Sequence, residues 1–317
     1  MLSVVAPAYN EREILPSFVE RTIAVLESTG TTWEIVLVDD GSNDGTWDAV
    51  LAAARADGRV RGVRLSRNFG HQLALTAGIS VARGDGVITM DSDLQHPPEV
   101  IPQLLAASVG NDVVYAVRSP QDAAGRWKRF SARVFYALLN RLSSLELPEG
   151  AADYRWMSRR VANVLLEMPE RHRFLRGLVR WAGYDQVFVE YHRPARQVGE
   201  SKYPLRKMVL FAWDAVVSFS SFPLRLASVI GALVSLLGWL YLIYTLVIRV
   251  FSNRVVPGWT SVTAAVLVLG GAQLVFLGIL GQYVGRMYDD VKRRPLFLIA
   301  EDTSDGVLRA GDEPRGP

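Results

Sequence analysis

The chain has 317 residues, of which 50% are hydrophobic and 21% charged, and its 35 Lys and Arg against 32 Asp and Glu give a formal net charge of +3. The absence of cysteine excludes a disulfide scaffold, a cysteine-ligated zinc site and a thiol nucleophile. A mean hydropathy of +0.15 is high for a water-soluble enzyme and predicts membrane-spanning segments. The sequence pI of about 9.2 raises nucleic acid as a partner, an interpretation that depends on where the basic residues lie.

Short apolar runs alternate with helical patterns in the N-terminal half. The first run, Leu2–Pro7, predicts a buried strand, and Leu2–Ala8 is too short for the apolar core of a signal peptide. Further strands are expected at Glu34–Val38, Val60–Leu65, Gly86–Met90 and Asp112–Val117, and helices at Glu13–Ser28, Trp47–Ala56 and Gly70–Ala82. This alternation predicts an α/β domain over residues 1–195, built on a mostly parallel sheet with both faces covered.

Acidic side chains gather where these predicted strands end, at Glu11, Asp39, Asp40, Asp91 and Asp93. Ligands of open parallel sheets bind at the carboxyl ends of the strands. Asp91 and Asp93, two residues apart after a buried strand, can hold a hard divalent cation that neutralises the charge of a departing diphosphate. The sequence therefore predicts a metal site among these five carboxylates, which we call the acidic rim.

Two uncharged segments dominate the C-terminal half. Leu226–Ile248 and Trp259–Val284 each exceed the roughly 20 residues that cross a bilayer core. We therefore expect transmembrane helices at 226–249 and 259–285. The following residues, 286–317, are expected to form a cytoplasmic tail that is disordered from Glu301 onward, because they are rich in Gly, Asp and Pro.

Basic side chains flank the two predicted spans on the sides away from the loop that joins them. Lys202, Arg206, Lys207 and Arg225 precede the first span, and Arg286, Lys292, Arg293 and Arg294 follow the second. The positive-inside bias predicts an integral protein of the cytoplasmic membrane with both termini and the α/β domain in the cytoplasm. Residues 196–225 are interpreted as an amphipathic juxtamembrane segment, with packing against the α/β domain as the alternative. Because the basic surplus belongs to the membrane-flanking region, nucleic acid is no longer expected as a partner.

A series of short motifs resembles the family 2 glycosyltransferases of the GT-A fold. They comprise Pro7–Glu11, Val38–Thr46, Arg67–Gly70, Asp91–Gln95 with Pro97–Glu99, Ala152–Arg155 and Arg196–Lys202. The Asp91–Gln95 stretch narrows the resemblance to the branch that glycosylates polyprenyl phosphates such as dolichol phosphate and bactoprenol. With the two uncharged segments, the resemblance covers residues 1–295. It implies a Rossmann-like GT-A catalytic domain, followed by interfacial helices and two transmembrane helices.

Two positions depart from the patterns of this superfamily. His96 stands where relatives more often carry Asp, at a position to which we assign no role. Ala152 replaces the Gln of the Q-x-x-R-W motif that is usual in processive polysaccharide synthases. The motif is therefore absent, which argues against the alternative of a polysaccharide synthase. A non-catalytic membrane scaffold is another alternative, against which the acidic rim argues.

The resemblance implies a donor site for a nucleotide sugar. The residues assigned to it are Pro7, Tyr9, Glu11, Val38, Asp39, Asp40, Ser92, Asp93, Gln95, Arg118, Arg196, Ser201 and Lys202. Asp91, Asp93 and Gln95 are the expected surroundings of Mg²⁺ or Mn²⁺ beside the donor diphosphate. Arg196 and Lys202 would offset diphosphate charge, the alternative for Lys202 being a lysine that reaches toward the membrane surface.

Asp153 matches the carboxylate proposed as catalytic base in this branch, and Asp91 is the second expected catalytic residue. A lipid phosphate with a second pKa of about 6 is already largely a dianion near neutral pH. Orienting the acceptor, or a basic neighbour such as Arg155, is therefore an equal alternative for Asp153. Arg126, Lys128, Arg129 and Arg155 are candidates to bind the acceptor phosphate, with a solvated basic face as the alternative.

Together these features predict inverting transfer of a hexose from a nucleotide sugar to a polyprenyl phosphate, such as undecaprenyl phosphate, at the cytoplasmic membrane face. UDP-glucose is the favoured donor, and UDP-N-acetylhexosamine, UDP-aminoarabinose and GDP-mannose are alternatives, because single motifs do not determine base or sugar. The resemblance also implies a homo-oligomer, commonly a tetramer.

Overall fold

The computed structural model describes residues 1–119, 151–171, 173–191, 222–251 and 258–305. They belong to two compact units. An α/β unit comprises the described residues up to Tyr191 together with those from Arg294 onward, and a helical unit lies within Leu205–Arg293. The α/β unit holds every described residue that the sequence predicts to form the site.

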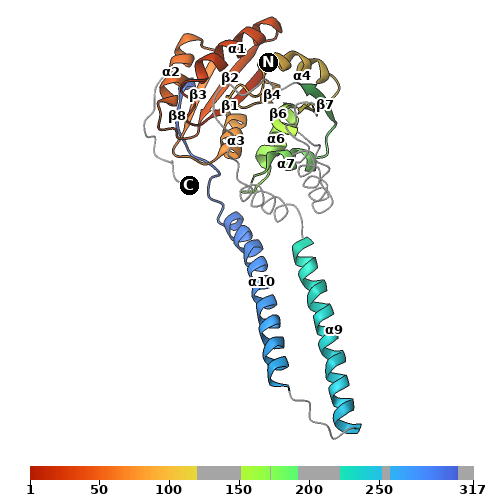
Figure 1. The fold of residues 1–317 in the computed structure, drawn as a ribbon. Coiled ribbons are helices and arrows are strands. Elements are labelled where there is room, and N and C mark those ends of the chain that lie inside the picture. The colour runs from red at the N-terminus through yellow and green to blue at the C-terminus, as the bar shows by residue number, and fades with distance from the viewer. Residues whose placement is uncertain (120–150, 172, 192–221, 252–257, 306–317) are drawn as a thin grey trace. The chain divides into compact units, whose positions relative to one another are not determined.

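An eight-stranded sheet forms the centre of the α/β unit (Figure 1). Its strands are β1 (Leu2–Ala8), β2 (Trp33–Asp39), β3 (Val60–Leu65), β4 (Gly86–Thr89), β5 (Val113–Arg118), β6 (Ala151–Ser158), β7 (Gln186–Tyr191) and β8 (Ile299–Asp302). They lie in the order β7-β5-β6-β4-β1-β2-β3-β8. All run in one direction except β6 and β8, which are antiparallel to their neighbours. The expected α/β fold on a mostly parallel sheet is confirmed, with two antiparallel strands that the sequence analysis did not place.

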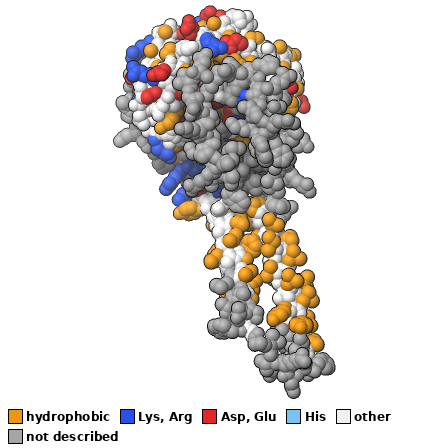
Figure 2. Space-filling view, in the orientation of Figure 1, with side chains coloured by type: hydrophobic (Ala, Val, Ile, Leu, Met, Phe, Trp, Pro, Cys, Tyr) orange, Lys and Arg blue, Asp and Glu red, His pale blue; other side chains and the backbone are white. Residues whose placement is uncertain are grey.

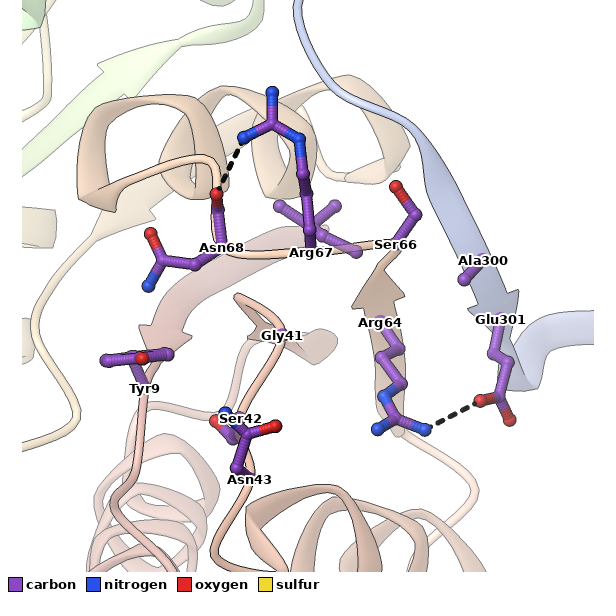
Figure 3. A pocket seen from close by; sticks show the side chains of 11 residues that line it. Tyr9, Gly41, Ser42, Asn43, Arg64, Ser66, Arg67, Asn68, Ala300 and Glu301 are labelled. Atoms are coloured by element: carbon purple, nitrogen blue, oxygen red, sulfur yellow. Dashed lines mark hydrogen bonds and ion pairs between the residues drawn. The ribbon is translucent and has the colours of Figure 1, made fainter.

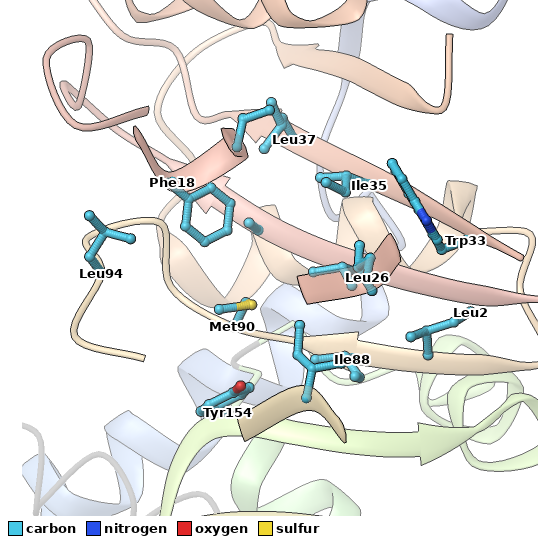
Figure 4. Close-up of a cluster of buried hydrophobic side chains, with 14 of the residues drawn as sticks. Leu2, Phe18, Leu26, Trp33, Ile35, Leu37, Ile88, Met90, Leu94 and Tyr154 are labelled. Carbon is cyan, nitrogen blue, oxygen red and sulfur yellow. The ribbon is translucent and has the colours of Figure 1, made fainter. Parts of the chain in front are cut away.

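Helices cover both faces of this sheet. On one face lie α1 (Leu15–Ser28), α2 (Thr46–Ala56), the one-turn η1 (Pro98–Val100) and α4 (Ile101–Ala107); on the other lie α3 (His71–Val81), α6 (Arg159–Glu167) and α7 (Leu175–Trp181). Because successive side chains of a strand point to opposite faces, Val4 joins the cluster around Phe18 of α1 while Val5 packs on α3 (Figure 4). Burial on both faces explains why the strands read as continuous apolar runs.

Gly78 marks a close approach of α3 to the sheet. A methyl group added there would overlap the side chain of Val5 and lie 3.0 Å from Cγ2 of Val38. Close-packed interiors leave no space for such a group without displacement of a neighbour. The glycine thus sets the distance between α3 and the two strands, β1 and β2, whose ends carry candidate site residues.

Both segments predicted to span a membrane are helical. They form α9 (Phe222–Phe251) and α10 (Trp259–Val291), whose large apolar side chains are mostly exposed (Figure 2). Among the described residues, one stretch, Val268–Val291, is both long and apolar enough to cross a membrane, and Leu226–Tyr241 is a shorter apolar stretch. Two transmembrane helices therefore stay a prediction, as does the juxtamembrane segment at 196–225, most of which lies outside the described residues.

The chain returns to the sheet after α10. Strand β8 pairs antiparallel with β3, and the one-turn η3 (Thr303–Asp305) follows it. The expectation of disorder from Glu301 onward is thus wrong for Glu301–Asp305. The acidic residues that suggested a solvated tail are matched by arginines of β3, since Glu301 pairs with Arg64 and Asp302 with Arg61. These partners are more than 200 residues away in sequence (237 for Glu301 and Arg64), so composition could not reveal them.

The contact at Gly78 predicts the effect of adding a single methyl group. Gly78→Ala should lower the free energy of unfolding by about 1–3 kcal/mol through overpacking, in spite of the roughly 1 kcal/mol that alanine contributes in a helix. Chemical denaturation of the full-length protein in detergent measures the change. Gly58→Ala is the control, because nothing lies within 4 Å of its added methyl group. Equal stability of the two variants would contradict the close packing of α3.

Candidate active site

The predicted acidic rim forms at the carboxyl ends of three adjacent strands. Glu11 follows β1, Asp39 and Asp40 end β2, and Asp91 and Asp93 follow β4. Strand β1 lies between β2 and β4, so these carboxylates share one edge of the sheet. The structure brings together the groups that the sequence placed at separate strand ends.

Asp40 joins the end of β2 to the start of α3. Its carboxylate accepts hydrogen bonds from the backbone N–H groups of Phe69 (2.7 Å) and Gly70 (2.9 Å). Burial raises the pKa of Asp40 although these bonds oppose the rise. Beside it, Gly41 has a positive φ of 70°, and a Cβ there would lie 2.5 Å from the backbone of Arg67. Only glycine suits this crossing of two loops.

Asp39 is fully buried next to the same loop. Its Oδ1 accepts the backbone N–H of Ser42 (3.0 Å), and its Oδ2 lies 3.3 Å from Nε of Arg64. Val38, also assigned to the donor site, is fully buried in β2. These two residues therefore lie behind the surface that a ligand would touch, and Ser42 and Arg64 lie in front of Asp39.

A cavity of about 480 Å³ opens at this edge of the sheet (Figure 3). Its lining comes from the loops after β1 and β2, from the end of β3 and from β8: Tyr9, Gly41, Ser42, Asn43, Arg64, Leu65, Ser66, Arg67, Asn68, Ala300 and Glu301. The volume suits a small-molecule ligand. The exposed ring of Tyr9 and the guanidinium of Arg64 supply an aromatic face and hydrogen-bond donors to the same space.

The turn after β4 carries the predicted metal ligands. Asp93 accepts two bonds from Gln95, one from the backbone N–H (3.0 Å) and one from Nε2 (2.5 Å). The hydroxyl of Ser92 donates to the carbonyl oxygen of Pro7 (2.7 Å) and contacts the Glu11 carboxylate. Burial raises the pKa of Glu11 to about 7, against the lowering effect of Ser92 and with a further rise from Asp93 and Asp91. Three carboxylates, those of Glu11, Asp91 and Asp93, thus lie close enough to influence one another.

The residues of this turn fit a divalent cation that is completed by its substrate. Within the part of the chain that the structure describes, no group of three or more His, Asp or Glu residues is arranged as a full metal site. Mg²⁺ commonly takes only one or two protein carboxylates and fills its remaining positions with phosphate oxygens and water. Oδ1 of Asp91 is buried and accepts no hydrogen bond, and Nε2 of His71 lies 3.3 Å from it.

Asp153 lies on β6 at the centre of a cluster of basic and amide groups. It is nearly fully buried, and its Oδ2 accepts from Nε2 of Gln72 (2.9 Å) and from Nη2 of Arg176 (3.2 Å), while its Oδ1 accepts from Arg155. Burial raises the pKa of this carboxyl, but the charges of Arg176 and Arg155 and the contact with His71 hold it well below its ordinary value. Asp153 is therefore ionised at neutral pH and has its oxygens occupied.

His71 connects this cluster to the metal turn, a role that the sequence analysis missed. As the first residue of α3, it places Nε2 3.3 Å from Oδ1 of Asp91 and 3.8 Å from Oδ2 of Asp153. Burial lowers its pKa, but the bond to Asp153 and the charge of Asp91 raise it more. Its position directly after the Arg67–Gly70 motif is the sequence feature that could have identified it as a site residue. Arg176, on α7, lies in none of the motifs, so no sequence feature identified it.

His96, to which the sequence analysis assigned no role, supports the same turn. Its Nδ1 accepts the backbone N–H of Asp91 (2.9 Å), and its ring stacks on Tyr154 with centroids 5.1 Å apart. The hydroxyl of Tyr154 in turn donates to the carbonyl oxygen of Pro97 (2.8 Å). A histidine at this position therefore orients the loop that presents Asp91.

Arg155, a candidate acceptor ligand, is buried. Its side chain is 1% exposed, pairs with Asp153 and lies over the ring of Tyr115. This pairing agrees with the alternative in which Asp153 orients Arg155, and binding of the acceptor phosphate by Arg155 stays a prediction. Arg118 ends β5 at the same edge of the sheet. The candidates Arg126, Lys128, Arg129, Arg196, Ser201 and Lys202 lie outside the described residues.

Comparisons with known proteins identify a family for this chain. Residues 3–166 match the model of glycosyl transferase family 2, and residues 222–287 match that of the GtrB C-terminal hairpin. The chain is 40% identical to an uncharacterised glycosyltransferase of Synechocystis sp., over 95% of both chains. It is 39% identical to the SfII prophage-derived bactoprenol glucosyl transferase of Shigella flexneri, over 94% of this chain and 97% of that one.

Among solved structures, the chain is similar to glucosyl-3-phosphoglycerate synthase from Mycobacterium tuberculosis in complex with Mn²⁺, uridine diphosphate and phosphoglyceric acid. The identity is 21% and the TM-score 0.48, over 68% of this chain and 76% of that chain. The family match covers more than half of the sequence, and the relatives match along nearly their whole length. The chain therefore belongs to glycosyl transferase family 2.

Proposed function

We propose that this chain transfers a hexose from a nucleotide sugar, with UDP-glucose as the favoured donor, to a polyprenyl phosphate at the cytoplasmic face of a membrane. The observation that carries the proposal is the sharing of one sheet edge by the cavity at Tyr9 and the acidic turn Asp91–Asp93. Relatives named bactoprenol glucosyl transferase, which match over almost the full chain, support the choice of acceptor. The apolar helices α9 and α10 support a membrane location.

In this proposal the donor lies across the rim. The base and ribose occupy the 480 Å³ cavity, where Tyr9 offers a ring face, and the diphosphate extends toward Asp91 and Asp93. UDP-N-acetylhexosamine and UDP-aminoarabinose stay alternatives, because the lining of this cavity would contact the nucleotide and not the sugar, and GDP-mannose stays an alternative because single motifs do not determine the base. The homo-oligomer implied by the resemblance also remains a prediction.

Mg²⁺ or Mn²⁺ is the cofactor that the turn after β4 would hold, through Asp91 and Asp93 with Gln95 beside them. When bound, such a cation stabilises the negative charge that develops on the departing diphosphate. The protein orients the turn for this purpose, because His96 holds the backbone of Asp91 and Gln95 holds both oxygens of Asp93. The neighbouring carboxylates Asp91 and Asp93, which also raise the pKa of Glu11, make this turn a favourable place for a positive charge.

The acceptor needs positioning more than deprotonation. A phosphate monoester is largely a dianion near neutral pH, so its oxygen can attack the anomeric carbon directly as the bond to the diphosphate breaks on the opposite face. Asp153, ionised and occupied by Gln72, Arg155 and Arg176, is poorly suited to accept a proton. We infer instead that it holds Arg176, whose side chain is 29% exposed, in place to bind the acceptor phosphate.

The reaction is tested by incubating the full-length protein with radiolabelled nucleotide sugars and undecaprenyl phosphate in the presence of Mg²⁺ or Mn²⁺. We expect one labelled sugar per lipid, no product after chelation of the metal, and a loss of more than about 100-fold in kcat for Asp93→Ala. Asp85→Ala is the matched control, because Asp85 precedes β4 and its side chain is 92% exposed.

Each competing function has its own result in this assay. Full turnover by Asp93→Ala would contradict the metal assignment. Several sugars on one lipid would favour a polysaccharide synthase, and nucleotide binding without turnover on any lipid phosphate would favour a scaffold.

The role of Arg176 is tested separately from the metal. Arg176→Ala should raise the KM for polyprenyl phosphate by about 10- to 100-fold, the effect of losing a charged hydrogen bond, and leave donor binding unchanged. Asp153→Asn should give a similar loss at every pH between 6 and 8.5, and the double variant should lose no more than the worse single variant. Arg180→Ala is the control, since Arg180 lies on the same helix and contacts Gln186. A defect of Asp153→Asn that disappears at high pH would instead identify Asp153 as a base.

A further inference from the structure

The C-terminal strand β8 completes the sheet beside β3, and both of its ends are held there. The carbonyl oxygen of Leu298 accepts the backbone N–H of Ser66 (2.9 Å), and Oγ1 of Thr303 accepts that of Gly62 (2.9 Å). Between these two bonds, β8 pairs with β3 through Glu301 and Asp302. The strand is thus placed securely enough to contribute to a binding site.

Two consecutive acidic residues of β8 each pair with an arginine of β3. Glu301 contacts Nη1 of Arg64 (3.1 Å) and accepts from Nε1 of Trp47 (3.2 Å). Asp302 accepts from Nε of Arg61 (2.9 Å). The two ion pairs are alike in chemistry and in the strands that they join.

Only one of these pairs faces the cavity assigned to the donor nucleotide. Ala300 and Glu301 line that cavity together with Arg64, whereas Asp302 does not contribute to it (Figure 3). Arg61 instead lines a different cavity, with Thr303 and Ser304. Because successive side chains of a strand point to opposite faces, the neighbouring residues Glu301 and Asp302 lie on different faces of β8.

Arg64 is held between two carboxylates. Its Nε lies 3.3 Å from the buried Oδ2 of Asp39, and its Nη1 lies 3.1 Å from Glu301. Asp39 belongs to β2 and Glu301 to β8, so the guanidinium is fixed from both sides of β3. A guanidinium has five N–H donors, so others are left for a ligand in the cavity that Arg64 lines.

We propose that Glu301 is a positioning residue for donor recognition: together with Asp39 it holds Arg64 so that the remaining N–H groups of Arg64 bind a carbonyl oxygen of the nucleotide base. The inference rests on the proposed function, because it takes this cavity as the donor site. It makes the strand that follows α10 one wall of that site. Recognition of the base then depends partly on Glu301, which lies after both apolar helices in the sequence.

The experiment compares Glu301→Ala with Asp302→Ala in the full-length protein in detergent. Each variant loses one ion pair between β8 and β3. Because Asp302 accepts from two nitrogens of Arg61 and from the backbone of Ser304, Asp302→Ala should lower the melting temperature at least as much as Glu301→Ala. Glu301→Ala should raise the donor KM and weaken UDP binding in calorimetry by about tenfold, with kcat within about twofold of the wild type. Asp302→Ala should leave both quantities unchanged. Glu301→Gln, which keeps an oxygen for Arg64 but no charge, should recover part of the affinity.

The possible results separate this inference from the proposed function. A wild-type protein that binds UDP and transfers sugar while Glu301→Ala keeps the wild-type affinity and KM overturns the positioning role alone. Equal loss of UDP affinity in Glu301→Ala and Asp302→Ala also overturns it, because the effect would then come from the stability of β8. A wild-type protein that binds no nucleotide overturns both proposals.

Discussion

Burial of the Asp153 carboxylate is the constraint on which the rest of the candidate site depends. A buried charge is costly unless it is paired and hydrogen-bonded, and Asp153 meets this requirement with groups from three different elements. Gln72 comes from α3, Arg155 from β6 itself and Arg176 from α7. The requirement therefore draws both helices to the same point of the sheet, and their side chains become the surroundings of the reacting groups.

The carboxylates that follow β1 and β4 have a different electrostatic environment from that of Asp153. Glu11, Asp91 and Asp93 lie near one another; burial raises the pKa of Glu11 to about 7, and the charges of Asp93 and Asp91 add to the rise. Asp153 is compensated by the protein, whereas this group is left for a charge from outside. The same edge of the sheet thus has one carboxylate that organises arginines and several that favour a divalent cation. His71, which contacts both Asp91 and Asp153, connects the two parts.

The parts of the fold that follow from local sequence pattern could be predicted. Apolar runs and helical spacing indicate the strands β1 to β5 and the helices α1, α2 and α3, and the acidic residues at the strand ends lie together because parallel strands end at one edge. Contacts between residues that are distant in sequence could not be predicted. The pairing of Glu301 with Arg64 joins residues 237 positions apart, and Arg176 reaches Asp153 from a helix without a recognisable motif. The burial of Arg155 could not be predicted either, because a basic residue in a motif gives no indication of its burial.

Strand β8 connects the apolar helix α10, along the chain, to the proposed donor site. It follows α10 after a few residues, and its Leu298 and Glu301 contact Ser66 and Arg64 at the edge of the cavity. A covalent path therefore runs from the helical unit directly into a wall of the proposed donor site. Within that wall, Arg64 is shared between Glu301 and the buried Asp39. The position of a single guanidinium would then depend on both the N-terminal half of the chain and the segment that follows its apolar helices.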